Sequence, residues 1–233
     1  MHQSSHLPCI HPSNGSMSVA DPLTYTADLC AGLRAHWPRN RLANIVCHGH
    51  SVPAGYFATP FVDTFNAHPH LLHRRLKARF PYAVINVIVT AIGGEHSLAG
   101  AERFAAEALC HRPRVITLDY GLNDRGLGLD TAEKSWRTMI ELALARDCLL
   151  ILLTPTPDRR AYHAPEWQLL RQHADQIRRL AAEYEVALAD SLAAFERALA
   201  QGTDLLNLMS WANHPNRRGH QLVADEIARW FPA

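Results

Sequence analysis

The chain has 233 residues, of which 48% are hydrophobic and 19% are charged, and these proportions are typical of one globular domain with a sizeable core. Acidic and basic residues are mixed along the chain and leave a formal net charge of +1, so neither nucleic acid nor an anionic membrane is an expected partner. The longest apolar runs, such as residues 148–153, are far too short to span a bilayer.

The beginning of the chain lacks the features of a folded or targeting segment. Its first residues, MHQSSHLPCIHPSNGS, contain no apolar stretch, so no secretory signal is expected there. We predict that residues 1–20 form a disordered extension and that residues 21–233 form the domain. The 5 cysteines are widely spaced and include no C-x-x-C pair, which argues against a zinc knuckle or a disulfide framework and favours reduced thiols in a cytoplasmic protein.

Short apolar runs alternate with amphipathic segments along the rest of the chain. The runs predict β-strands at 42–47, 83–89, 115–120, 148–154 and, more weakly, 186–189. The amphipathic segments predict helices at 62–79, 97–111, 131–146, 167–184, 190–200 and 219–230. Asp130-Thr131 and Asp190-Ser191 are candidate helix N-caps.

This strand-helix alternation predicts an α/β fold of three layers, α/β/α and flavodoxin-like, around a parallel sheet of about five strands. In such a sheet, ligands bind at the carboxyl ends of the strands. The residues that directly follow each strand are therefore the first candidates for a functional site.

Four of these strand-end or late-loop residues carry the chemistry of acyl transfer. Ser51 follows the first strand beside a glycine, Gly94 follows the second, Asn123 follows the third, and His214 lies in a Pro-flanked loop before the last helix. A hydroxyl nucleophile needs a base to take its proton and donors to hold the oxyanion that forms. We therefore expect Ser51 as nucleophile, His214 as base, and an oxyanion hole from the Ser51 and Gly94 N–H groups and the Asn123 amide.

The blocks around these residues resemble those of the SGNH (GDSL-like) hydrolase family. They are GHS at 49–51, GGE at 93–95, GLND at 121–124 and HPN at 214–216, in the family's order and each after a strand or in the C-terminal histidine loop. The resemblance extends from about residue 42 onward and implies hydrolysis of ester bonds. The G-x-S-x-G elbow of ordinary α/β-hydrolases does not occur in the chain.

The chain departs from the family pattern at two positions. His50 stands where an Asp is usual, and Trp211 stands three residues before His214, where the family places the acid that orients its histidine. Indole cannot accept a hydrogen bond from imidazole, so another group must fix the tautomer. We expect a main-chain carbonyl in the 210–213 loop to do so, with Asp204 as the alternative acid.

Other polar and aromatic residues have plainer interpretations. The histidines at 68, 70 and 73 lack the spacing of metal ligands, so we expect surface residues there and no metal or cofactor. His48 and His50 are expected to wall the pocket, and Asp124 to hold its loop. The aromatic residues at 56, 57 and 211 could line an acyl or sugar pocket, with core packing as an equal alternative.

The sequence thus predicts a serine esterase of the SGNH type acting on a small-molecule ester with a short acyl group, with an acylated carbohydrate as the first expectation. Two alternatives stay open: a non-catalytic binding protein that keeps the fold, and a lipase or thioesterase for longer acyl groups. The sequence leaves the oligomeric state undetermined.

Overall fold

The computed structural model describes residues 19–161 and 165–233 of the chain. The predicted N-terminal extension lies outside the described residues except for its last two positions, and Ala20 already donates its amide N–H to the Val186 carbonyl. Among the described residues, no helix has both the length and the apolar character needed to cross a membrane.

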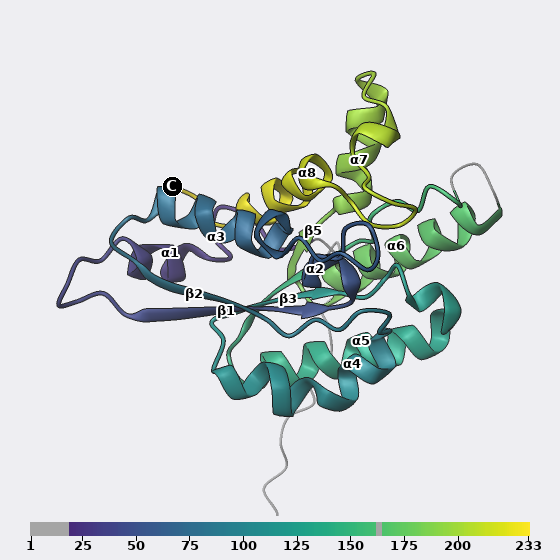
Figure 1. The fold of residues 1–233 in the computed structure, drawn as a ribbon. Helices are drawn as coiled ribbons and strands as arrows, with labels where there is room; N and C mark the ends of the chain where they lie inside the picture. Colours follow the sequence, from purple (N-terminus) through teal and green to yellow (C-terminus); the bar gives the residue numbers. More distant parts are fainter. Residues whose placement is uncertain (1–18, 162–164) are drawn as a thin grey trace, which may run out of the picture.

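A single parallel sheet forms the centre of the molecule, as predicted (Figure 1). Its strand order is β2-β1-β3-β4-β5, and every neighbouring pair is parallel. The strands are β1 (Leu42–Gly49), β2 (Val84–Val89), β3 (Val115–Asp119), β4 (Leu149–Leu153) and β5 (Ala187–Ala189).

Helices cover both faces of this sheet and give the three expected layers (Figure 1). One layer contains α1 (Ala27–Leu33), α3 (His68–Arg79), α7 (Ser191–Ala200) and α8 (Arg217–Ala228). The other contains α4 (Ser97–Arg103), which continues through a π-helical segment at Phe104–Ala108, together with α5 (Leu129–Leu144) and α6 (Pro165–Glu183). The short helix α2 (Ser51–Ala54) lies at the carboxyl end of β1.

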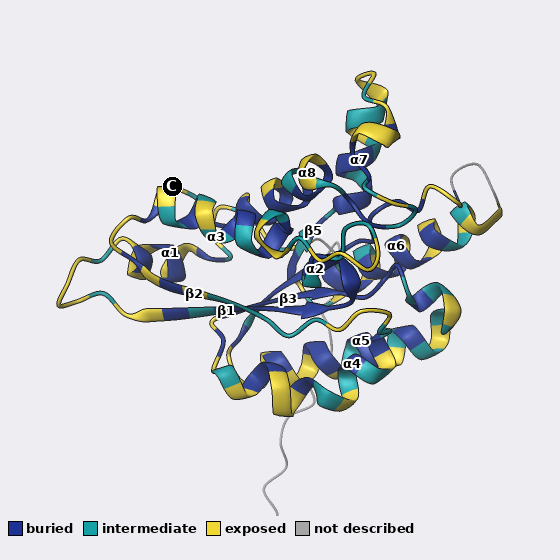
Figure 2. Ribbon diagram, viewed as in Figure 1, coloured by how far each residue is buried: buried dark blue, intermediate teal, exposed yellow. Residues whose placement is uncertain are grey.

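The core is divided by the sheet because successive strand residues point to opposite faces. Ile45 and Val115 pack with the layer of α3 and α8, whereas their neighbours Val46 and Ile116 pack with α5 and α6. The inner strands β1, β3 and β4 are therefore largely buried on both sides (Figure 2), which explains why they appear in the sequence as continuous apolar runs, whereas the edge strand β2 is partly exposed.

Most helix boundaries differ from the prediction by one or two residues, and two of the differences have a clear physical reason. The segment 62–79 is a 3₁₀ turn at Thr64–Asn66 followed by α3, because Pro69 is tolerated only in the first turn of a helix and so fixes where α3 starts. The proposed Asp130-Thr131 cap is wrong: α5 begins at Leu129, after Gly128 in a positive-φ conformation. Asp190 does cap α7, accepting the Ala193 N–H at 3.1 Å.

Candidate active site

The first site element is the sharp turn between β1 and α2. Gly49 ends the strand opposite Asp119 of β3, and a Cβ at Gly49 would lie 2.5 Å from the Asp119 carbonyl oxygen. Only glycine fits this approach of two strands. The chain turns directly afterwards, so that Ser51 becomes the first residue of α2, at the carboxyl edge of the sheet and largely buried.

The second element is the loop before α8. Met209 pairs with Pro215 in an isolated antiparallel bridge, and the Ser210 hydroxyl donates to the His214 carbonyl at 3.0 Å. Asn216 then caps α8 by accepting the N–H groups of residues 218 and 219. The backbone on both sides of His214 is thus held by hydrogen bonds, which restrains the direction of its ring.

The structure brings the predicted nucleophile and base together. Ser51 Oγ and His214 Nε2 lie 3.0 Å apart, within the range of a hydrogen bond. The other ring nitrogen, His214 Nδ1, lies 3.1 Å from the carbonyl oxygen of Phe57. A carbonyl can only accept, so Nδ1 carries the proton and Nε2 presents its lone pair to the serine hydroxyl.

The predicted source of the orienting carbonyl was therefore wrong. It is not in the 210–213 loop but at Phe57, in the segment that follows α2. Asp204 is not the orienting acid either, since its carboxylate accepts the Leu206 N–H at 2.9 Å and caps a 3₁₀ turn. Trp211 is exposed at the surface. No sequence signal could have identified Phe57, because every residue has a carbonyl and only the fold decides which one meets the ring.

The protonation state of His214 follows from its burial. Removal of the ring from water lowers the pKa of His214, and this effect outweighs the Phe57 carbonyl, which favours the charged form. The ring is therefore neutral near pH 7 and free to accept a proton from Ser51.

Two of the three predicted oxyanion donors, Gly94 and Asn123, lie on loops that a hydrogen bond ties together. The Asn123 side-chain amide donates one N–H to the Glu95 carbonyl at 2.8 Å, which ties the loop after β3 to the loop after β2 and leaves its second N–H unused by that bond. Gly94 has a φ of 79° and is exposed, with nothing within 4 Å of the place where a Cβ would stand. Its backbone conformation favours glycine.

An aromatic ring joins the base to the glycine loop. The Tyr56 ring lies 5.9 Å from the His214 ring, centroid to centroid, and a Cβ at Gly93 would stand 2.8 Å from the Tyr56 ring carbon that carries the hydroxyl. Tyr56 is half-buried. A side chain at position 93 would collide with the Tyr56 ring, so the packing of Tyr56 requires glycine there. The sequence alone did not reveal this reason.

Asp124 has the structural position that its sequence context favours. Its carboxylate accepts the Ser97 N–H and the Trp136 indole N–H, both at 2.8 Å, and is fully buried. Burial raises the pKa of Asp124. These bonds join the β3 loop to α4 and α5 and so support the position of Asn123.

A further carboxylate that the sequence did not single out lies in the loop after β4. Asp158 is buried and accepts from the guanidinium groups of Arg125 at 2.9 Å and Arg160 at 3.0 Å. The next residue, Arg159, donates its N–H to the Ala212 carbonyl at 2.7 Å. The β4 loop is thereby fastened to the loop that carries His214.

Several histidines lie elsewhere than predicted. His48 is not a pocket wall: it is fully buried, with Nε2 3.0 Å from the Gly100 carbonyl and Nδ1 2.8 Å from the Thr90 hydroxyl. His50 is also buried. His68 is not a surface residue, since its ring packs 5.7 Å from that of His220 in the interior. Within the described residues, no group of three or more possible ligands could hold a metal.

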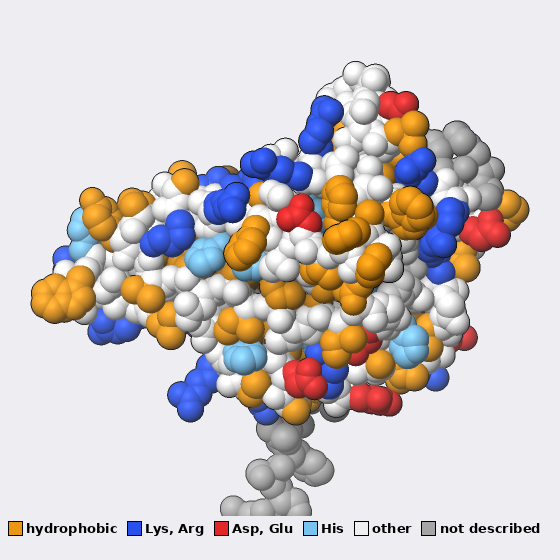
Figure 3. All heavy atoms as spheres, in the orientation of Figure 1, with side chains coloured by type: hydrophobic (Ala, Val, Ile, Leu, Met, Phe, Trp, Pro, Cys, Tyr) orange, Lys and Arg blue, Asp and Glu red, His pale blue; other side chains and the backbone are white. Residues whose placement is uncertain are grey.

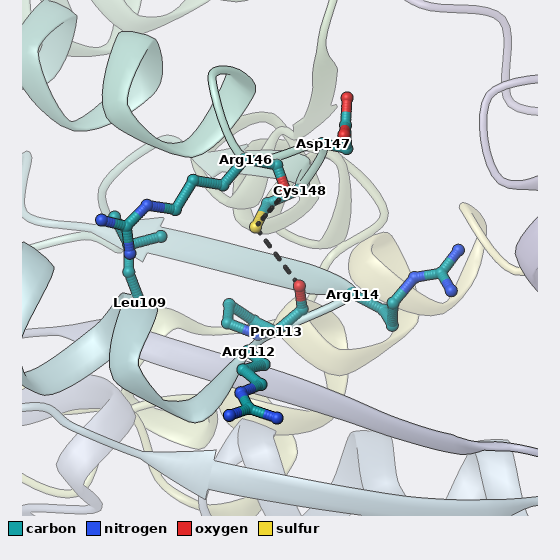
Figure 4. A pocket seen from close by; sticks show the side chains of 7 residues that line it. All are labelled: Leu109, Arg112, Pro113, Arg114, Arg146, Asp147 and Cys148. Carbon is teal, nitrogen blue, oxygen red and sulfur yellow. Dashed lines mark hydrogen bonds between the residues drawn. The ribbon is translucent and has the colours of Figure 1, made fainter.

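A cavity of about 540 Å³ lies at the opposite edge of the sheet, where β3 and β4 begin. It is lined by Leu109, Arg112, Pro113, Arg114, Arg146, Asp147 and Cys148. Figure 4 shows the three guanidinium groups pointing in different directions, so they do not converge on a common ligand. The chemistry of Ser51 and His214 belongs to the other edge.

The fold and the strand-end residues together define a class. A parallel β2-β1-β3-β4-β5 sheet between two helical layers, with a serine after β1 facing a histidine before the last helix, is the architecture of three-layer α/β/α ester hydrolases. The GDSL-like lipase/acylhydrolase family model matches residues 47–222. The chain therefore belongs to the GDSL-like lipase/acylhydrolase family, and it is a carboxylic ester hydrolase by class.

Solved structures share this fold at low sequence identity. A catalytic mutant of Axe2, an acetylxylan esterase from Geobacillus stearothermophilus, matches with a TM-score of 0.74 and 18% identity, over 86% of this chain and 97% of that one. LAE5, an alpha/beta hydrolase enzyme from the metagenome of Lake Arreo, Spain, matches with a TM-score of 0.71 and 22% identity, over 82% of this chain and 97% of that one. No curated protein sequence matches the chain.

A third match is to a larger protein. CEX, a two-domain esterase active on acetylated mannans, gives a TM-score of 0.71 and 17% identity, over 90% of this chain and 52% of that chain. The present chain thus spans about half the length of that esterase.

Proposed function

We propose that the protein is a serine esterase that removes short acyl groups, in particular acetyl groups, from a carbohydrate. The observation that carries the proposal is the 3.0 Å separation of Ser51 Oγ and His214 Nε2, with Nδ1 of the same ring held by the Phe57 carbonyl. This arrangement is the nucleophile-base-orienter geometry of acyl transfer, with a carbonyl in the place of an acid.

In the first half-reaction, His214 Nε2 takes the Ser51 proton while Oγ attacks the ester carbonyl carbon. The oxyanion that forms is held by the Ser51 and Gly94 N–H groups and the second side-chain N–H of Asn123. His214 then gives its proton to the leaving alcohol as the carbon–oxygen bond breaks. In the second half-reaction, water attacks the acyl-serine, His214 accepts a proton from that water, and the released Ser51 Oγ recovers it.

Apolar side chains at the edge of the site support a substrate with apolar surfaces. Phe61, Val62, Ile92 and Trp211 are exposed and belong to the three loops that supply the Phe57 carbonyl, Gly94 and His214. Figure 3 shows hydrophobic side chains gathered over and beside α2. Sugar rings present apolar C–H faces to aromatic side chains, and the relatives by fold named above include esterases of acetylated xylan and mannan.

The same exposed residues also favour the second candidate, a lipase or thioesterase for longer acyl groups, because an acyl chain would gain from burial against them. A series of p-nitrophenyl esters from acetate to octanoate separates the two. A short-chain esterase should show its highest kcat/KM with acetate or butyrate, whereas an octanoate preference would favour the lipase.

Two measurements test the proposal directly. A fluorophosphonate probe should label the wild type on Ser51, as located by mass spectrometry, because only an activated serine reacts. Ser51→Ala should abolish labelling, and Ser135→Ala, which changes a serine bonded within α5, should not. Absence of labelling in the folded wild type would favour a non-catalytic binding protein.

The carbohydrate part of the proposal needs its own test. Trp211→Ala should raise KM for acetylated xylo-oligosaccharides and leave kcat/KM for p-nitrophenyl acetate unchanged, since the small ester has no sugar ring to pack on the exposed indole. Equal KM values of wild type and Trp211→Ala for the oligosaccharide would mean that Trp211 does not contact the substrate.

A cytoplasmic location also stays a prediction. The four cysteines of the described residues are free thiols.

A further inference from the structure

His50 directly precedes the proposed nucleophile Ser51 and stands at the start of the same short helix. The residue is the N-cap of α2, and its imidazole is only 1% exposed. Its Nδ1 accepts the Val52 amide N–H at 3.1 Å. An imidazole nitrogen that accepts an N–H carries no proton, so the proton of neutral His50 must be on Nε2.

A buried carboxylate faces that proton. Asp119 Oδ1 lies 3.3 Å from His50 Nε2, and Asp119 is 2% exposed. The two atoms are not aligned as a hydrogen bond, yet neither has any other hydrogen-bond partner in ranges 19–161 and 165–233. Buried polar atoms without partners are exceptional in proteins. The approach of a donor to an acceptor explains why both are tolerated here.

The sheet fixes this pair in place. Gly49 and Asp119 are directly opposite in the β1–β3 register, and the His50 N–H donates to the Asp119 carbonyl at 3.2 Å. The absence of a side chain at Gly49 permits this close approach. The position of Asp119 relative to His50 is therefore set by the backbone of two paired strands, not by a mobile loop.

We propose that His50 is a positioning residue for Ser51 and that Asp119 makes it one, by holding the imidazole in its Nε2–H tautomer. Nδ1 is then always available to cap α2 and to fix the direction of the Ser51 N–H and Oγ. In the opposite tautomer, Nδ1–H would point at the Val52 N–H, and two donors would face each other. The proposal rests on the proposed function of Ser51.

The His50–Asp119 pair also explains how the chain tolerates His50 at the position where the family usually has an Asp. An Asp there would cap α2 with its own carboxylate, because Asp is among the preferred N-cap residues. Here the cap is a neutral nitrogen, and the carboxylate belongs to Asp119 on the neighbouring strand β3. The chain thus keeps both a cap for α2 and an acid, but divides them between His50 and Asp119.

The first experiment compares two replacements of His50. His50→Ala removes the cap acceptor and should lower kcat for p-nitrophenyl acetate on the order of tenfold to a hundredfold, with KM little changed, because it misplaces the nucleophile without touching the substrate. His50→Asn supplies a side-chain oxygen that can cap α2 and should restore most of kcat. The control is Asp204→Ala, which removes an exposed cap away from Ser51 and should leave kcat unchanged.

The second experiment tests Asp119 through a double-mutant cycle. Asp119→Ala should lower kcat strongly in the wild-type background and weakly in the His50→Asn background, where no tautomer has to be fixed. Asp119→Asn keeps an oxygen that accepts the Nε2–H and should retain most of the activity. Equal losses in both backgrounds, or full kcat in His50→Ala, would overturn the proposal.

A spectroscopic measurement is independent of ester hydrolysis. In ¹⁵N-histidine-labelled protein, the ring signals of His50, assigned by their loss in His50→Asn, should show the Nε2–H tautomer, and Asp119→Ala should add the Nδ1–H form. A wild type in the Nδ1–H form refutes the positioning role even if the esterase is active. A wild type with the expected tautomer but no activity on esters refutes instead the proposed function.

Discussion

Three histidines buried in the folded protein should make its stability sensitive to mild acid. Burial lowers the pKa of His48 to about 4, of His173 to about 4 and of His220 to about 3. All three are almost completely inaccessible to solvent. In the unfolded chain each imidazole is hydrated and takes up a proton near the ordinary value of about 6.5.

The sign and size of the effect follow from this difference. The unfolded state binds protons first as the pH falls, so the stability is intact above pH ~6.5 and is lost as the pH falls toward the folded-state pKa values. At pH ~5 each of the three histidines should have lowered the free energy of unfolding by about 2 kcal/mol, since one pH unit corresponds to about 1.36 kcal/mol per proton. The sum, about 6 kcal/mol, is comparable with the whole stability of a typical domain.

Urea unfolding at pH 7.5, 6 and 5, followed by circular dichroism, measures this loss. The informative variant is His173→Leu, because His173 Nε2 is buried and has no hydrogen-bond partner among the described residues. Its free energy of unfolding should fall by about 2 kcal/mol less than the wild type's between pH 7.5 and 5. The exposed His36 serves as the control, and His36→Gln should behave like the wild type. An identical pH dependence in His173→Leu and wild type would refute the reasoning.

Four further outcomes concern catalysis. Asn123→Ala should lower kcat on the order of a hundredfold to a thousandfold, as for loss of one oxyanion donor, and unchanged turnover in steady-state kinetics would give Asn123 another role. Ser51→Ala and His214→Ala should each abolish turnover, and the double variant should be hardly worse than either, because the two side chains act as a unit. Since burial lowers the pKa of His214, the midpoint of the acid-side fall in kcat/KM should lie below the ordinary imidazole value of about 6.5, as a pH-rate profile would show. Trp211→Asp should leave kcat for p-nitrophenyl acetate equal or higher; a large loss would mean that the exposed indole supports the loop.

The sequence by itself determined the layered fold and the family. Apolar runs of strand length alternating with amphipathic segments permit few arrangements other than a doubly wound sheet, because each element must bury its apolar surface against a neighbour. The same regularity placed Ser51, Gly94 and Asn123 at one edge of that sheet. The resemblance to the family added the expectation that a carbonyl, not an acid, orients His214, since Trp211 occupies the position where the family has its acid.

Only the tertiary structure decided which groups meet that site from distant parts of the chain. The carbonyl on His214 belongs to Phe57, 157 positions away, and the carboxylate at His50 comes from Asp119 on the neighbouring strand. Backbone carbonyls are alike in every sequence, and a buried acid cannot be told from an exposed one by its neighbours along the chain. Which of them faces an imidazole is fixed by strand register and by the packing of loops, which follow from contacts that a local sequence pattern does not contain.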